Sequence, residues 1–124
     1  MSFVVDTDTC SAYIKAHPQL VENFLKGYIE SLHYFRTQKE KSLAGIMKFL
    51  KMTDRARAEE GYDYYVDVTP LMPYPSAAGV RSVLQFLAAR QPKAAAANPE
   101  DFYDNSFLKR IEDGGFTKSL ASKR

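Results

Sequence analysis

Apolar residues recur at helical spacing from Pro18 to Arg36 and define the longest element that the sequence predicts. Pro18 suits the first helical turn because its missing N–H needs no partner there. At 100° per residue the apolar residues cover about half the circumference, wider than the ~100° stripe that one neighbour covers. We therefore expect a helix that begins at His17 or Pro18 and contacts at least two other elements. Its apolar side comprises Leu20, Val21, Phe24, Leu25, Tyr28, Ile29, Leu32 and Phe35.

The helical pattern resumes after a polar interruption at residues 37–40. A second amphipathic helix is predicted there, with an apolar face of Leu43, Ile46, Met47, Phe49 and Leu50. Thr53 is the expected N-cap of a third helix, since Asp54 then lies at its positive end. The expected buried side of this third helix comprises Ala58, Tyr62, Tyr65 and Val66. Short connections predict that neighbouring helices are antiparallel.

Proline and glycine residues divide the second half of the chain. Residues 68–75 contain three prolines and predict a stiff extended connector. Ser76 is the expected N-cap of a fourth helix that ends before Pro92. Residues 98–101 carry the cap, proline and acidic residues of a short helix, and Gly114-Gly115 closes a last one. The apolar residues of these helices are Val80, Val83, Leu84, Leu87, Phe107, Leu108 and Ile111.

The two ends of the chain are predicted to be less regular. Ser2 to Val5 is β-capable and predicts an edge strand or a frayed terminus, and residues 10–16 predict a short helix. Thr117 to Arg124 is interpreted as a loose basic tail. The fold class is therefore all-α: one domain over residues 1–116, a bundle of four to six amphipathic helices with at most one short N-terminal strand, followed by the tail at 117–124.

Composition narrows the class of protein. The 124 residues suffice for one domain, and 45% hydrophobic with 26% charged residues is ordinary for a globular chain. A net charge of +2 is too small to imply a polyanionic partner. No apolar run approaches the ~20 residues that cross a bilayer, so we expect no transmembrane segment and a soluble protein or part of one. The first ten residues lack the pattern of a signal peptide, so the sequence as written is expected to stay in the cytoplasm.

Residue types that bind metals or act as nucleophiles are few. Cys10 is the single cysteine, and His17 and His33 have no helical or HExxH relationship. Asp6-x-Asp8 lacks the glycine and glutamate that complete a calcium loop. No glycine-rich phosphate loop or nucleophile elbow occurs. We therefore predict no catalytic residue, metal site or cofactor, and assign no ligand-binding residue.

Charged and aromatic clusters on the predicted second and third helices have ordinary interpretations. Residues 36–57 are basic and resemble the outline of a helix-turn-helix, but the acidic residues that follow would repel a phosphate backbone. We therefore expect no nucleic-acid partner. The acidic residues Glu59, Glu60 and Asp63 favour a solvated helix face over acid–base chemistry. The aromatic cluster of Tyr62, Tyr64 and Tyr65 favours packing over base stacking.

Short motifs in a fixed order resemble one family. His17-Pro18 opens a helix that continues with Phe24-Leu25 and Glu30, and Tyr74-Pro75-Ser76 opens a later helix. The closing pattern comprises Pro99, Asp101-Phe102, Asp104, Ser106-Phe107, Ile111-Glu112 and Gly115-Phe116. Together these motifs resemble the C-terminal part of the solute-binding proteins of ABC importers of the taurine, nitrate and sulfonate type, whose relatives also bind thiamine precursors. The resemblance extends over residues 10–116.

The resemblance implies a fold and a role. Members of that family have two α/β lobes around a hinge, and their C-terminal helices cover these lobes. The chain would then be the C-terminal segment of a periplasmic or cell-surface protein that delivers a small organic solute to an ABC permease. A stand-alone helical interaction or regulatory module is the alternative. In either case, too few neighbours cover the 18–36 helix, so we expect a homo-oligomer, most simply a dimer.

Overall fold

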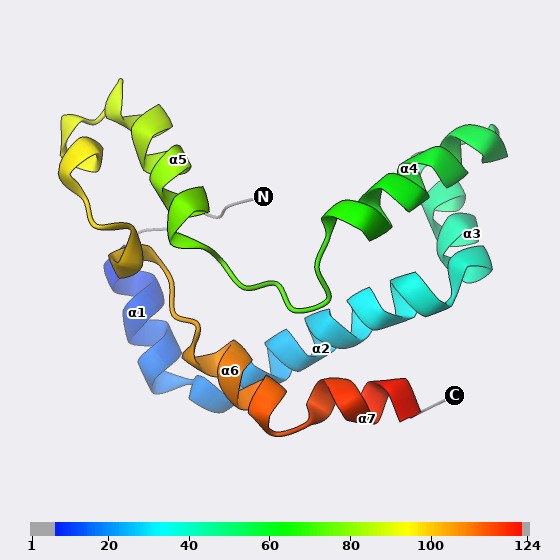
Figure 1. Ribbon diagram of the computed structural model, residues 1–124, viewed down its shortest axis with the longest axis horizontal. Coiled ribbons are helices and arrows are strands. Elements are labelled where there is room, and N and C mark those ends of the chain that lie inside the picture. Colours follow the sequence, from blue (N-terminus) through cyan, green and yellow to red (C-terminus); the bar gives the residue numbers. More distant parts are fainter. Residues whose placement is uncertain (1–6, 123–124) are drawn as a thin grey trace.

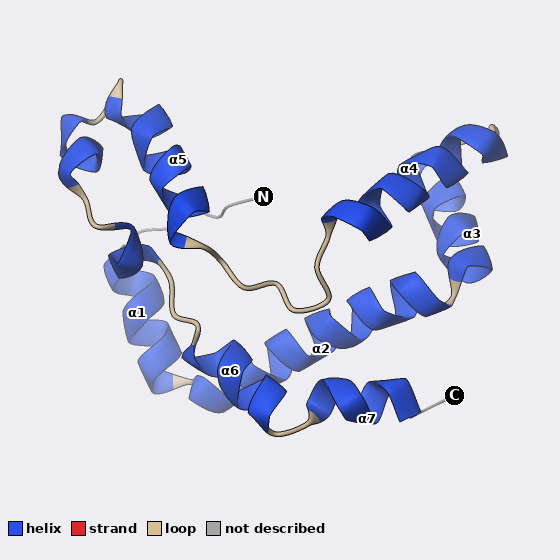
Figure 2. Cartoon of the chain, in the orientation of Figure 1, coloured by secondary structure: helices blue, strands red, loops and turns tan. Residues whose placement is uncertain are grey.

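The computed structural model describes residues 7–122 and contains helices and connecting segments but no strand in that range (Figures 1 and 2). This confirms the all-α prediction, whereas the predicted strand at Ser2 to Val5 lies outside the described residues. The first four α-helices are α1 (Thr7–Ala16), α2 (Pro18–Thr37), α3 (Lys39–Leu50) and α4 (Arg55–Val68). The remaining elements are α5 (Ala77–Ala88), the 3₁₀ helices η1 (Pro92–Ala96) and η2 (Pro99–Phe102), α6 (Ser106–Asp113) and α7 (Phe116–Ser122).

Helix α2 is the central element of the fold. In Figure 1, α3 and α4 lie at its C-terminal end, α6 lies along its N-terminal half, and α7 runs beside its C-terminal half. The proline at the first position of α2 confirms the predicted start of this helix. Helix α5 extends away from α2 and packs mainly against η1 and η2. The arrangement is open, and most of the buried residues fall into two separate clusters along α2.

The first cluster joins α2 to the C-terminal helices. Ile29 of α2 is fully buried against Leu108 and Ile111 of α6 and Leu120 of α7. Leu71 and Met72 of the extended connector pack against the same cluster. Burial of these apolar side chains is the main force that holds α6, α7 and the connector on α2.

The second cluster holds α3 and α4 against the end of α2. Leu43 of α3 is fully buried with Ala58 and Tyr62 of α4. Phe35 of α2 packs against this cluster, and its ring lies 4.7 Å from that of Tyr62 between centroids. Helix α3 ends at Leu50, and its C-cap Lys51, with φ of 53°, reverses the chain toward α4. The two clusters explain why α2 needs more than one neighbour.

Several predicted boundaries were confirmed and others were wrong. Ser76 caps α5 by accepting a hydrogen bond from the Gly79 amide at 3.1 Å, and Gly115, with φ of 73°, follows the end of α6. The N-cap of α4 is Asp54 rather than Thr53, because its carboxylate accepts from the Arg57 amide at 3.1 Å.

The predicted loose tail at 117–124 was wrong for residues 117–122, which belong to α7. This extra helix gives seven α-helices in residues 7–122, one more than the upper end of the predicted range. Leu120 is buried against α2 and α6, so apolar contact orders a segment whose polar and basic composition suggested a loose end.

The surface of the chain is large for its mass. It exposes 9577 Å², whereas a compact monomer of 14.0 kDa exposes about 6,700 Å². The excess is about 2,900 Å². An excess of this size agrees with the open arrangement of the helices.

Candidate functional site

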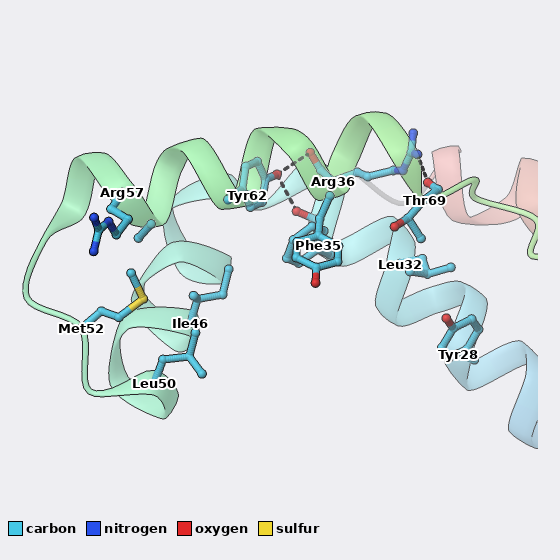
Figure 3. Close-up of a pocket in the computed structure, with 13 residues that line it drawn as sticks. Tyr28, Leu32, Phe35, Arg36, Ile46, Leu50, Met52, Arg57, Tyr62 and Thr69 are labelled. Atoms are coloured by element: carbon cyan, nitrogen blue, oxygen red, sulfur yellow. Dashed lines mark hydrogen bonds between the residues drawn. The ribbon is translucent and has the colours of Figure 1, made fainter. Parts of the chain in front are cut away.

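An apolar groove of about 480 Å³ lies between the C-terminal half of α2, α3 and α4 (Figure 3). Figure 3 shows Met52, Ile46 and Leu50 below α4 at one end of the groove, and Leu32 and Tyr28 of α2 at the other. The groove is lined by Tyr28, Leu32, Phe35, Arg36, Ile46, Leu50, Met52, Arg57, Ala58, Gly61, Tyr62, Tyr65 and Thr69. It is the candidate functional site of the chain.

Tyr62 fixes the centre of the groove. Because α2 ends at Thr37, its last carbonyl groups lose their helical N–H partners. The Tyr62 hydroxyl donates to the Phe35 carbonyl at 2.6 Å, and the Ser42 hydroxyl donates to the same oxygen at 3.3 Å. The end of α2 is thereby satisfied by side chains of α3 and α4, which sets the positions of the three helices around the groove.

Replacing Tyr62 with phenylalanine is expected to lower the free energy of unfolding by about 0.5–1.5 kcal/mol, the net worth of a typical hydrogen bond. The ring is retained, so the loss reports the hydroxyl contact with the Phe35 carbonyl. Urea denaturation measures the change. Tyr65→Phe is the matched control, because Tyr65 is exposed and should shift stability by no more than about 0.5 kcal/mol. Equal effects of the two variants would contradict the assigned role of Tyr62.

Arg36 closes one side of the groove against the end of α4. Its guanidinium donates to the Val66 carbonyl at 2.8 Å and to the Thr69 carbonyl. Val66 lies in the last turn of α4, where carbonyl groups lack intrahelical partners. A cation at a helix C-terminus is also favoured by the helix dipole. Arg36 therefore attaches α2 to the C-terminal end of α4 through neutral partners.

Two other basic residues of this region, Lys39 of α3 and Arg55 of α4, form ion pairs outside the groove. Lys39 binds Asp63 at 2.8 Å, and this hydrogen bond raises the pKa of Lys39. Arg55 binds both Glu40 and Glu59 at 2.9 Å. The residues of the predicted acidic cluster thus include two partners of basic side chains, and the basic character of residues 36–57 is partly neutralised.

The remaining candidate residues from the sequence are not brought together. His17 lies between α1 and α2 with its ring 4.7 Å from that of Tyr13, whereas His33 is half-buried in the second half of α2. Within residues 7–122 no group of three or more His, Cys, Asp or Glu side chains is placed to hold a metal ion. In the same range, none of the helices combines the length and apolar character needed to cross a membrane.

The groove was only partly foreseeable. Tyr62 is buried as predicted and Val66 is half-buried, but Tyr65 is exposed at the groove and not part of the core. Arg57 was noted only as part of a basic segment, and no sequence pattern identified it as a groove residue. The apolar face predicted for α3 was the sequence signal for the groove, since Ile46 and Leu50 both line it.

A second notable surface is the uncharged face of α2, which comprises Leu20, Phe24, Gly27, Tyr28 and Ser31. All five residues are exposed, and Phe24 exposes 69% of its surface. These positions lie on one side of the helix at 100° per residue. Because Tyr28 also lines the groove, the uncharged face and the groove form one continuous apolar surface.

Comparisons with known proteins identify no relative: no family model, curated protein or solved structure matches this chain.

Proposed function

We propose that this chain is the C-terminal helical segment of a solute-binding protein of ABC importers of the taurine, nitrate and sulfonate type. The parent protein captures a small organic solute, a sulfonate, nitrate or a thiamine precursor, and delivers it to an ABC permease. Its place of action is the periplasm or the cell surface. The proposal assigns no catalytic residue to the chain.

The uncharged face of α2 is the observation that best supports the proposal. Helices that cover a sheet have a broad apolar side, and α2 buries only part of its apolar side within this chain. Ile29 is buried by α6 and α7, whereas Leu20 and Phe24 remain exposed. In the resembling family the C-terminal helices cover the α/β lobes, so a face of this kind would pack on a lobe. The order of the motifs from His17-Pro18 to Gly115-Phe116 supports the same assignment.

The solute site of such a parent is a cleft that is lined from several sides. This chain supplies few of those walls, so we assign no solute-contacting residue to it. Without the α/β lobes, the exposed apolar surface favours association with a second copy. The proposal therefore includes a homo-oligomer for the isolated chain.

The test has two parts: the sequence of the upstream reading frame is determined, and solute binding is measured. Sequencing of the transcript upstream of Met1 should reveal an in-frame α/β region. The complete protein should then bind taurine, nitrate or a pyrimidine thiamine precursor in titration calorimetry, and the 124-residue chain should not. The isolated chain is the matched control, because it has the same helices and lacks the lobes.

Two results would contradict the proposal. A transcript without an in-frame α/β region would favour the alternative, a stand-alone helical interaction or regulatory module. Tight binding of one of these solutes by the 124-residue chain would show that a complete solute site exists without the lobes.

A further inference from the structure

The groove between α2, α3 and α4 has the size and walls of a small-molecule site. Its volume of about 480 Å³ falls within the range of about 300–1,000 Å³ that is typical of ligand pockets. Aromatic side chains form its centre: Phe35 and Tyr62 pack together, and Tyr28 and Tyr65 line it further out. An apolar ligand body would therefore replace solvent along most of its length.

The charged groups of the groove are of one sign. Arg36 and Arg57 are the charged residues among its described lining side chains, and none of these is acidic. No carboxylate of residues 7–122 forms a salt bridge with Arg57, in contrast to the neighbouring Arg55. Arg36 is bound by neutral carbonyl oxygens, which leave its charge uncompensated. Figure 3 shows the two arginines apart, with Arg57 at the end of the groove where Met52 lies and Arg36 beside Thr69.

We propose that this groove binds an amphiphilic anion, a molecule with an apolar chain or ring that ends in a carboxylate or sulfonate. The apolar body lies along Ile46, Leu50 and Phe35, and the anionic group pairs with the Arg57 guanidinium. Arginine suits this role because its planar fork matches the geometry of a carboxylate. The inference does not depend on the proposed function, which assigns the solute of the parent protein to a different cleft.

A second copy of the chain is the competing occupant, and charge disfavours it. The surface that a second copy would offer is the uncharged face of α2, centred on Phe24. Covering the groove with that face would desolvate Arg57 without supplying a carboxylate, which is costly. An anionic ligand instead compensates the charge while it fills the apolar walls.

The test compares three ligands with the same ten-carbon chain and different head groups: decanoate, 1-decanol and decylammonium. Titration calorimetry on the whole chain, below the micellar concentration, should give at least about tenfold tighter binding for decanoate than for decanol, because charge-assisted hydrogen bonds are the strong ones. Decylammonium should bind most weakly. Helix content by circular dichroism should stay constant, which separates binding from unfolding. Equal affinities for the three ligands would overturn the proposal.

Two substitutions test whether the ligand binds in the groove, with its anionic group at Arg57. Arg57→Gln should weaken decanoate binding at least about tenfold and leave decanol unchanged, whereas Arg90→Gln, beyond α5, should change neither. Gly61→Leu should weaken binding of both ligands, since Gly61 lines the groove and a Cβ there meets no atom within 4 Å. Unchanged decanoate binding in either Arg57→Gln or Gly61→Leu would overturn the proposal. Two results together would assign the groove to a second copy of the chain: the unsubstituted chain does not bind decanoate, and Gly61→Leu converts a dimer to a monomer.

Discussion

Replacing Ile29 with alanine is expected to lower the free energy of unfolding by about 2–5 kcal/mol. Ile29 is 0% exposed and packs against Leu108, Ile111 and Leu120, so the change removes apolar contacts and leaves a cavity between α2, α6 and α7. The side chains around Ile29 are themselves packed in the cluster, so they can refill only part of the cavity. The loss should be measured in urea at one fixed protein concentration, because association would otherwise change the apparent stability.

Phe49→Ala is the matched control for Ile29→Ala. It removes an even larger apolar side chain, but Phe49 exposes 86% of its surface on α3 and lies outside both buried clusters. Its effect should stay within about 0.5 kcal/mol. Leu25→Ala should cost less than Ile29→Ala, since Leu25 is only half-buried at the edge of the same cluster. A smaller cost for Ile29→Ala than for Phe49→Ala would mean that α6 and α7 do not pack on α2 as described.

Light scattering of the isolated chain is expected to give a mass that rises with concentration toward twice the 14.0 kDa of the monomer. The uncharged face of α2 drives this association, because its exposed residues Leu20, Phe24 and Tyr28 form a continuous apolar surface. A standard interface buries about 800 Å² on each partner. A two-fold dimer through α2 would therefore have to bury this face together with exposed apolar residues next to it.

Phe24→Lys should convert this dimer to a monomer, because a charge at the centre of the α2 face would be buried without a partner. Phe86→Lys is the control: Phe86 is 78% exposed but lies on α5, away from the α2 face, and the dimer should persist. A chain that stays strictly monomeric at high concentration would refute the association. Loss of the dimer in both variants would place the interface elsewhere.

The sequence by itself determined the helices. Pro18 marks the start of α2, Ser76 the start of α5 and Gly115 the end of α6, and each acts through its own backbone or an amide within three residues. Local geometry of this kind is independent of the rest of the fold, which is why the all-α class and the main boundaries could be predicted. The width of the apolar side of α2 also predicted more than one neighbour, and the two clusters confirmed it.

Only the tertiary structure decided which apolar residues are buried. Ile29 and Phe24 lie on the same broad side of α2, yet one is fully buried and the other is exposed, because α6 and α7 cover part of that side. The same long-range contacts order α7 through Leu120, and they bring Arg36, Arg57 and Tyr62 to one groove. Periodicity identifies the apolar side of a helix, but the elements that cover it come from distant parts of the chain, and their positions depend on packing that no local pattern encodes.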